Sequence, residues 1–238
     1  MNNRFVIRVA DIALGIESAY DYLPWLCSGY QTDAEPEVWF SASADEVAAM
    51  RDMQPEPCSD GYCESICVFA KVCGFLWSRD ICMMHGAAIE MDGRAYLFTA
   101  PSGTGKSTHI LQWRKRYGDR VHIINGDKPF LQQRGGKLWV CGSPWCGKEG
   151  WSANISAPLS AVCFVTRAET NTIRRLDTRE TMRGLFLQVA APENTADLDV
   201  FFRMMDLLVR DVPCYELGCT ISEQAAEVAY HGMKEETT

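Results

Sequence analysis

Hydrophobic and polar residues alternate only over short stretches in the first part of the chain. Apolar side chains at every second position of residues 5–9 predict an amphipathic or edge strand, and residues 38–40 (Val-Trp-Phe) predict a second short strand. Residues 53–61 contain two prolines and an Asp-Gly pair, so they predict a loop. We therefore expect a small α+β region over residues 1–60, followed at this loop by a larger domain over residues 61–238.

The larger domain reads as strands and helices in turn. Residues 62–77 carry apolar positions at helical spacing, and residues 85–90 and 94–99 predict two strands joined by an Asp-Gly hairpin turn. The remaining elements are expected as strands at 121–124, 161–165 and 214–217, a hairpin turn at 134–136, and helices at about 106–117, 178–189, 196–210 and 221–232. These patterns predict an α/β protein whose strands run in mixed directions.

Composition excludes several classes of protein. The chain has 238 residues, of which 47% are hydrophobic and 23% charged, as in ordinary globular domains, so disordered and fibrous structures are excluded. The formal net charge of −8 argues against nucleic acid or an anionic membrane as a partner. No apolar run reaches the ~18–20 residues that a membrane span requires.

The cysteines and the amino terminus indicate the cytoplasm. The first residues lack the apolar core of a secretion signal, and an odd total of eleven cysteines is unlike a disulfide framework, so we expect reduced thiols. Cys58, Cys63, Cys67 and Cys73 are not spaced like the paired cysteines of zinc or iron–sulfur sites. Core packing is therefore the preferred interpretation of these four thiols, with a metal site as the alternative.

The strongest signal for function is residues 100–108, Ala-Pro-Ser-Gly-Thr-Gly-Lys-Ser-Thr, which match the P-loop pattern with Ala in place of its first Gly. A strand precedes this segment and a helix follows it, as phosphate binding requires. Gly103 and Gly105 can take positive φ, which lets successive amides and the helix amino terminus face one phosphate. We expect ATP and Mg²⁺ to bind here, with nucleotide contacts from Ser102, Gly103, Thr104, Gly105, Lys106, Ser107 and Thr108.

A carboxylate is expected to hold the metal from the other side. Asp127 follows the predicted strand at 121–124, and its distance from the P-loop suits one helix and a return to the sheet. Ser107 and Asp127 are therefore the predicted Mg²⁺ ligands, and Lys106 would stabilise charge on the transferred phosphate. The alternative interpretation of Asp127 is a turn residue within Asn-Gly-Asp-Lys-Pro.

The order of these motifs resembles that of the HPr kinase/phosphorylase catalytic domain. His85-Gly86, the Asp-Gly hairpin, Ser-Gly-Thr-Gly-Lys-Ser and a strand ending in an acidic residue carry the resemblance, which spans roughly residues 80–220. The nucleotide-binding core of ATP-dependent phosphoenolpyruvate carboxykinase is similar. The resemblance implies a mixed-sheet P-loop core with a small amino-terminal α+β region, ATP·Mg²⁺ as phosphoryl donor and a Ser or Thr hydroxyl as acceptor.

The chain departs from the resemblance at one catalytic position. HPr kinases carry two adjacent aspartates after the second strand, the first acting as base and the second facing the metal, and this sequence reads Gly126-Asp127. His85 matches the family histidine and could accept the proton or polarise the acceptor instead. The predicted catalytic residues are His85, Lys106 and Asp127, and a core histidine is the alternative for His85.

Residues 142–149 (Gly-Ser-Pro-Trp-Cys-Gly-Lys-Glu) have the composition of a rigid loop at a site entrance. In that interpretation Trp145 packs against an acceptor segment, Lys148 contacts phosphate and Glu149 supports the metal or acceptor. The alternative is a loop that leaves a hairpin and buries its tryptophan.

The leading hypothesis is an ATP-dependent kinase that phosphorylates a hydroxyl of a small protein or peptide chosen by the amino-terminal region. HPr kinases are oligomers, so the resemblance leaves a homo-oligomer open. A second hypothesis is a nucleotide-binding regulatory module without phosphoryl transfer, because the first aspartate is missing. Carboxykinase-like chemistry is less favoured, because the chain is too short and lacks an evident arginine cluster for a carboxylic acid.

Overall fold

The amino-terminal part of the chain folds around a three-stranded sheet of order β1-β2-β3. A computed structural model describes residues 3–234. Strands β1 (Asn3–Val9) and β2 (Ile12–Ser18) form an antiparallel hairpin, and β3 (Val38–Phe40) pairs in parallel with β2. The predicted strands at 5–9 and 38–40 are present, and β2 is an addition.

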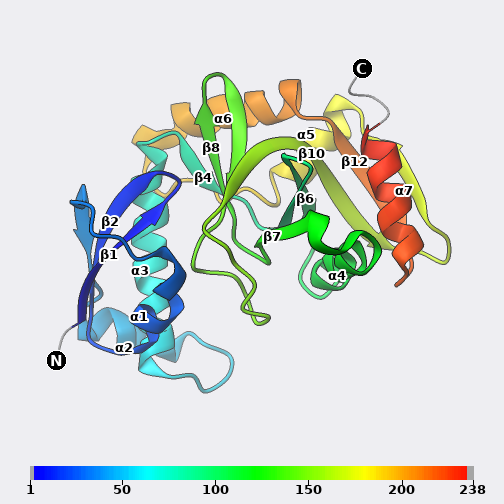
Figure 1. The fold of residues 1–238 in the computed structure, drawn as a ribbon. Coiled ribbons are helices and arrows are strands. Elements are labelled where there is room, and N and C mark those ends of the chain that lie inside the picture. Colours follow the sequence, from blue (N-terminus) through cyan, green and yellow to red (C-terminus); the bar gives the residue numbers. More distant parts are fainter. Residues whose placement is uncertain (1–2, 235–238) are drawn as a thin grey trace.

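Helices cover this small sheet. The helices are α1 (Tyr22–Leu26), α2 (Ala44–Asp52) and α3 (Asp60–Trp77), with a short 3₁₀ turn, η1, at Ser28–Tyr30. The predicted loop occupies residues 53–59, and α3 begins directly after it because the Ser59 side chain accepts the amide of Tyr62. Val68, Val72 and Leu76 of α3 pack with Ile7 and Leu14 of the sheet. The division at residue 60 stays a prediction, and the helix that follows it packs on the amino-terminal sheet (Figure 1).

The larger part of the chain is a nine-stranded mixed sheet. Its strands are β4 (Ile81–Met83), β5 (Ala87–Met91), β6 (Arg94–Thr99), β7 (Val121–Asn125), β8 (Phe130–Arg134), β9 (Lys137–Cys141), β10 (Ser156–Arg167), β11 (Thr172–Arg175) and β12 (Cys214–Cys219). The main path runs β4-β8-β9-β10-β6-β5-β7, and β12 joins β10 and β11. Strand β10 is parallel to β6 and β12, and the other pairs are antiparallel. The predicted mixed α/β class is confirmed.

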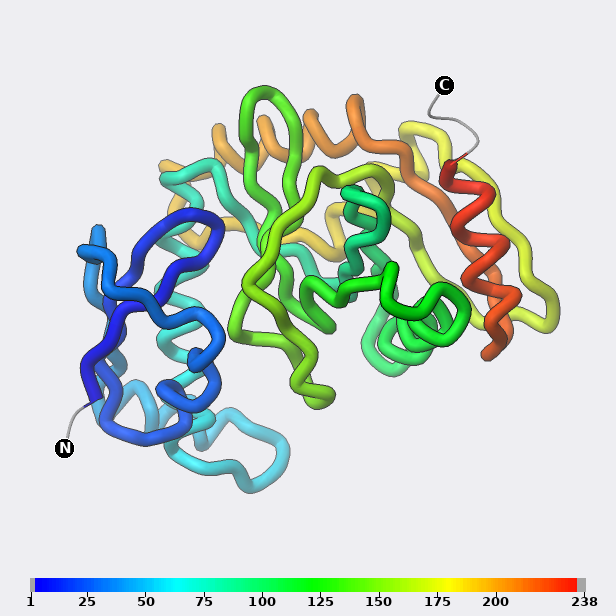
Figure 2. Tube along the Cα trace, viewed as in Figure 1, coloured from blue at the N-terminus to red at the C-terminus, as the bar shows by residue number. Residues whose placement is uncertain are grey.

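Helices lie on both faces of this sheet, as Figures 1 and 2 show. They are α4 (Lys106–Tyr117), α5 (Thr178–Leu185), α6 (Leu198–Asp211) and α7 (Glu223–Lys234), with 3₁₀ turns η2 at Gly118–Arg120 and η3 at Thr195–Asp197. Alternation along β6 explains the two layers: Leu97 points into the core under α6, whereas Tyr96 and Phe98 point into the core under α4 and α7. No helix within residues 3–234 is long and apolar enough to cross a membrane.

Candidate phosphate-binding site

The order of strands brings three predicted segments to one edge of the sheet. Strand β5 is antiparallel to both β6 and β7, so β6 and β7 end at the same edge and β5 begins there. The P-loop follows β6, the turn with Asp127 follows β7, and His85 precedes β5. The amide of Gly86 donates to the carbonyl of Asp127 at 2.9 Å, which joins two of these segments directly.

The P-loop has the backbone conformation that the sequence predicts. Gly103 has φ +77° and Gly105 has φ +118°, both in the left-handed region that glycine tolerates, and α4 begins immediately afterwards at Lys106. The amide and the hydroxyl of Thr104 both donate to the Pro101 carbonyl, which closes the turn. Ser102 and Gly103 are exposed, whereas Thr104, Gly105, Ser107 and Thr108 are half-buried. The loop therefore presents an open surface in front of a helix amino terminus.

Lys106 is folded back beneath this loop. Its side chain is buried, with 7% of the residue exposed, and Nζ donates to the Ala100 carbonyl at 3.0 Å. Burial lowers the pKa of Lys106, and the negative charges of Asp127 and Glu149 oppose that shift. An ammonium group has three donors, and one carbonyl acceptor contacts it among the residues that the structure describes. The remaining donors suit an anion bound in front of the loop.

Arg167, which the sequence analysis did not select, fixes the P-loop from the neighbouring strand. It is the last residue of β10, the parallel partner of β6, and its guanidinium donates to the carbonyls of Gly103 at 2.6 Å and Thr104 at 3.2 Å. The parallel pairing of β10 with β6 places Arg167 beside the P-loop, and no local sequence pattern indicates that pairing.

Asp127 lies in a turn built by the buried side chain of Asn125. The carboxamide oxygen of Asn125 accepts the amides of Asp127 at 2.8 Å and Lys128 at 2.7 Å, while its nitrogen donates to the carbonyls of Ser143 and Trp145. Asparagine favours such local turns, so the sequence could indicate the turn at Asn125. No sequence pattern indicates the contacts of Asn125 with residues 143–145.

The carboxylate of Asp127 faces two basic groups. His85 Nε2 lies 3.2 Å from Asp127 Oδ1, and Lys128 Nζ forms an ion pair with Oδ2. Burial alone would raise the pKa of Asp127, but the hydrogen bonds from His85 and Lys128 outweigh it and hold the pKa well below its usual range. Asp127 is therefore ionised at neutral pH, as a metal ligand or an ion-pair partner must be.

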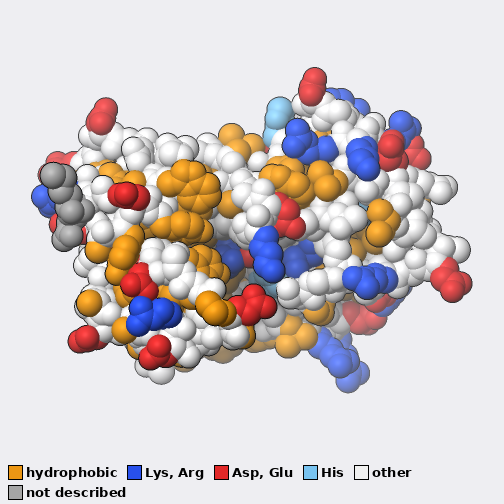
Figure 3. Space-filling model, turned by 90° about the horizontal axis from the view of Figure 1, so that it is seen from below, with side chains coloured by type: hydrophobic (Ala, Val, Ile, Leu, Met, Phe, Trp, Pro, Cys, Tyr) orange, Lys and Arg blue, Asp and Glu red, His pale blue; other side chains and the backbone are white. Residues whose placement is uncertain are grey.

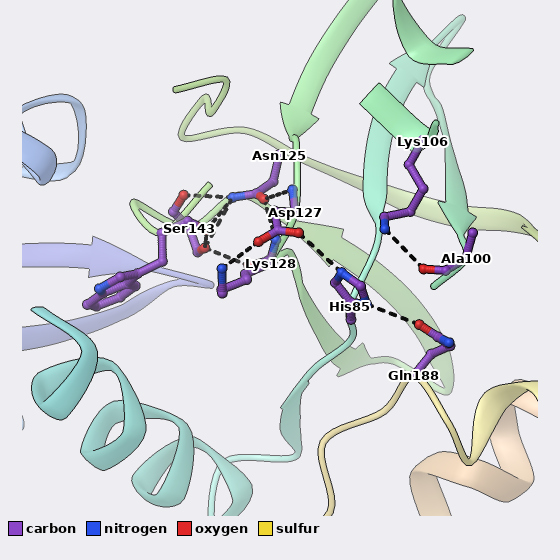
Figure 4. Close-up of polar contacts among 9 residues, drawn as sticks. His85, Ala100, Lys106, Asn125, Asp127, Lys128, Ser143 and Gln188 are labelled. Atoms are coloured by element: carbon purple, nitrogen blue, oxygen red, sulfur yellow. Dashed lines mark hydrogen bonds and ion pairs between the residues drawn. The ribbon is translucent and has the colours of Figure 1, made fainter. Parts of the chain in front are cut away.

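His85 is held between Asp127 and a residue from a distant turn (Figure 4). Gln188, which follows α5, places Oε1 3.2 Å from His85 Nδ1 and 2.9 Å from the hydroxyl of Thr99. The Thr99 hydroxyl also contacts the His85 carbonyl at 2.7 Å. His85 therefore lies beside Asp127, and both of its ring nitrogens have partners in the described structure. No pattern in the sequence indicated Gln188 as one of these partners.

Residues 142–149 also reach this site, but Trp145 does not face an acceptor. Trp145 is 6% exposed, its Nε1 donates to the carbonyl of Ser65 on α3, and its ring lies 5.0 Å from that of Phe69. Of the two interpretations of this loop, the buried tryptophan is confirmed and the acceptor contact is wrong, because the amino-terminal region covers the ring. Lys148 and Glu149 are exposed.

Gly126, where the resemblance calls for a first aspartate, is covered by the same loop. A β-carbon at this position would lie 3.2 Å from the Cys146 carbonyl oxygen and 3.5 Å from that of Trp151. The Gly126 amide donates to the Trp151 carbonyl at 2.9 Å. The glycine and the loop are matched, because the loop backbone fills the space that a side chain would need.

The structure does not bring together a set of three metal-ligating side chains. Within residues 3–234, no group of three or more His, Cys, Asp or Glu residues could hold a metal ion, and this includes the region of Cys58, Cys63, Cys67 and Cys73. All eleven cysteines are free thiols. The predicted pair of Ser107 and Asp127 offers oxygen donors, one of them ionised, which is the chemistry that Mg²⁺ accepts when phosphate supplies further ligands.

Comparisons with known proteins give little further information. No protein-family model matches the sequence, and no curated protein matches it. Among solved structures, the chain is similar to the HPr(Ser) kinase/phosphatase from Coxiella burnetii, with 14% sequence identity and a TM-score of 0.36 over 65% of this chain and 98% of that one. A likeness of this size carries no argument about the site, so the proposals below rest on the residues themselves.

Proposed function

We propose that this protein binds ATP with Mg²⁺ and transfers the γ-phosphoryl group to a Ser or Thr hydroxyl of a small protein or peptide. One observation carries the proposal. A glycine loop with an open surface and a buried, under-coordinated Lys106 lies at the same edge of the sheet as the ionised Asp127. Phosphate recognition needs the glycine loop and Lys106, and the Mg²⁺ that accompanies the phosphates needs a carboxylate such as Asp127.

The residues divide the work of binding as follows. The amides of residues 102–107 and the ammonium of Lys106 bind the phosphate oxygens, and Arg167 fixes the loop that carries these amides. Ser107 and Asp127 would hold Mg²⁺, which supplies charge neutralisation on the transferred group. Lys128 must then leave Oδ2 of Asp127, and its side chain, which is 35% exposed, would have to turn towards solvent.

His85 is the proposed acceptor of the hydroxyl proton. Nε2 contacts Asp127 in this structure, so its lone pair would become free for the hydroxyl proton once Asp127 turns to Mg²⁺ and Gln188 Oε1 accepts from Nδ1–H. As the bond between the acceptor oxygen and the γ-phosphorus forms, the bond from that phosphorus to the β–γ bridging oxygen breaks and ADP leaves. The hydroxyl proton passes to Nε2, and Asp127 stabilises the resulting imidazolium. A loose transition state places a small demand on this base.

Radiolabelled ATP with a panel of Ser- and Thr-containing peptides tests the proposal. We expect label on a peptide, and loss of both transfer and ATP binding in Lys106→Met, while the matched change Lys137→Met in the exposed β8–β9 hairpin leaves both unchanged. Tight ATP binding with no transfer to any peptide would replace the kinase with a nucleotide-binding regulatory module. The homo-oligomer stays a prediction, and sedimentation of the purified protein measures it.

A further inference from the structure

Three exposed aromatic side chains and one half-buried ring, Tyr22, form a surface on the amino-terminal region, which we call the aromatic shelf: Tyr20, Tyr22, Trp25 and Tyr62. Trp25 is 67% exposed, Tyr62 40% and Tyr20 36%. The ring of Tyr22 lies 5.6 Å from that of Trp25 and contacts Tyr62 edge-on at 6.0 Å. Large aromatic rings gathered in water indicate a surface that another molecule covers.

The backbone beneath the shelf is firmly tied to α3. A β-carbon at Gly61 would lie 2.8 Å from Tyr22 Cβ and 3.1 Å from Tyr20 Cβ, so this glycine allows the shelf to pack directly on the first turn of α3. Glu64 is buried and accepts the Ser18 hydroxyl at 2.5 Å and the Ala19 amide at 2.7 Å. The shelf is therefore formed before a partner arrives, which lowers the entropic cost of binding.

The shelf adjoins the proposed transfer site through residues 145–147. Trp145 Nε1 donates a hydrogen bond to the carbonyl of Ser65, which lies about one turn along α3 from Tyr62. At the other end of this segment, Gly147 lies against the side chain of Asp127. Burial first, and then the neighbouring Tyr62 and Cys146, raise the pKa of Tyr22. In Figure 1 the loop extends downwards between the amino-terminal helices and α4.

Charge along the chain is divided sharply between the two parts. Residues 1–60 contain eleven acidic residues (Asp or Glu) and three basic residues (Lys or Arg). Residues 61–238 contain twenty acidic and twenty basic residues. The whole net charge of −8 therefore belongs to the region that carries most of the shelf. Figure 3 shows apolar side chains gathered on the left half of the lower face, over this region, and most Lys and Arg side chains on the right half.

Carboxylates border the shelf directly. Asp21 is exposed and lies between Tyr20 and Tyr22 in the chain, and Asp60 accepts the hydroxyl of Tyr20 at 3.3 Å. Arg51 pairs with Asp60 at 2.6 Å, and it is one of three basic residues in this region. Aromatic faces with a negative border attract cations, both through the ring quadrupoles and through long-range charge.

We propose that the aromatic shelf docks a positively charged segment of another polypeptide, with Lys or Arg side chains over the rings of Trp25 and Tyr62. That this segment carries the acceptor hydroxyl rests on the proposed function. A second copy of this chain is disfavoured as the occupant, because docking shelf to shelf brings two strongly acidic regions together. Nucleic acid and anionic lipid are repelled for the same reason.

Fluorescence anisotropy with labelled synthetic peptides tests the docking without nucleotide. Two peptides of alternating Leu, Ser and charged residues are compared, one with Lys and one with Glu at the same positions. We expect the Lys peptide alone to bind, and to bind about tenfold more weakly to Trp25→Ala. Trp25→Phe should retain most of the affinity, and Phe202→Ala, which removes a 55% exposed ring on α6, should retain all of it. Asp21→Asn and added salt should also weaken binding, whereas Asp199→Asn on α6 should not.

Several outcomes would overturn this inference. Equal binding of the two peptides would remove the charge preference, and full affinity in Trp25→Ala would remove the shelf. A dimer that Trp25→Ala dissociates would assign the surface to a second copy. Calorimetry with ATP and Mg²⁺ is run separately: ATP binding without Lys-peptide binding rejects the shelf alone, and Lys-peptide binding without ATP binding rejects the proposed function and retains the shelf.

Discussion

Gly147 lies directly against the side chain of Asp127. A β-carbon on Gly147 would be 3.0 Å from the β-carbon of Asp127 and 3.3 Å from its carboxyl carbon, and Gly147 has φ +78°. The carboxylate is thus enclosed by His85, Lys128 and a backbone segment that carries no side chain at the point of contact. The loop at 142–149 therefore helps to set the position of the predicted metal ligand.

The first prediction concerns this contact. Gly147→Ala should lower the free energy of unfolding by about 1–2 kcal/mol through backbone strain, and should also weaken the Mg²⁺-dependent part of ATP affinity because Asp127 must move. Gly150→Ala is the matched control, since Gly150 has φ +67° and open space where its β-carbon would lie. Urea unfolding and calorimetry with and without Mg²⁺ separate the two effects. Equal ATP affinities in the two variants would contradict a role for the contact.

Arg167 gives a second prediction, because it holds the P-loop without belonging to it. Arg167→Gln removes charged hydrogen bonds to the carbonyls of Gly103 and Thr104, and we expect ATP affinity to fall about tenfold with little change in stability. Arg203→Gln, which removes an exposed ion pair with Asp80, should leave ATP affinity unchanged. Calorimetric titration measures both variants, and an unaltered affinity in Arg167→Gln would show that the loop keeps its shape without this side chain.

The parts of the fold that sequence predicted well depend on neighbouring residues. Asp92-Gly93 joins β5 to β6 as a two-residue turn, with Asp92 at φ +55° and Gly93 at φ +78°, because this pair tolerates positive φ. The glycines of the P-loop and the boundaries of α4 followed in the same way from local backbone preference. The amphipathic run at about 196–210 predicted a helix, and α6 (Leu198–Asp211) buries Met204 and Leu208 in the core.

The parts that sequence did not predict depend on distant partners. Strands β4 and β11 are three and four residues long, too short for a hydrophobic pattern to predict them. They are strands because they pair with β8 and β12 respectively. Gln188 contacts His85 because the turn after α5 returns to β4 through the bridge between Met84 and Val189. The sequence leaves a buried and an acceptor-facing Trp145 equally open, because no pattern in its own loop indicates that α3 covers it. Such contacts require the tertiary arrangement.

His109 gives a third prediction, on pH dependence. The ring is buried beside Phe98, accepts from Trp113 Nε1 at 2.9 Å, and burial lowers its pKa to about 4. In the unfolded chain a histidine binds its proton near pH ~6.5, so the unfolded state takes up the proton first as the pH falls. The free energy of unfolding should therefore fall between about pH 6.5 and pH 4, by up to ~3 kcal/mol, and this term should level off below that range.

Urea unfolding at a series of pH values measures this dependence. His109→Gln stays neutral throughout, so its stability should vary less than that of the wild type within the window. The side chain of His122 is 60% exposed, so it serves as the control. His122→Gln should keep the pH dependence of stability that the wild type shows. A wild-type slope retained in His109→Gln would place its origin in another group.

Gly126 gives the last prediction, because the resemblance to HPr kinases suggests that an aspartate here would improve a base-deficient kinase. The structure leads to the opposite expectation. The new β-carbon would press against the Cys146 carbonyl at 3.2 Å, and the carboxylate would face carbonyl oxygens of both Cys146 and Trp151. Gly126→Asp should therefore lose about 1–3 kcal/mol of stability and should not gain phosphoryl transfer.

Gly126→Ala separates the two causes, since it adds the β-carbon without the charge. We expect it to lose less stability than Gly126→Asp and to keep the loop in place. Tryptophan fluorescence reports on the loop, because displacement of residues 142–151 would expose Trp145, which is otherwise buried against α3. A stable Gly126→Asp protein with faster transfer than the wild type would contradict this prediction and would mean that the loop yields readily to the added side chain.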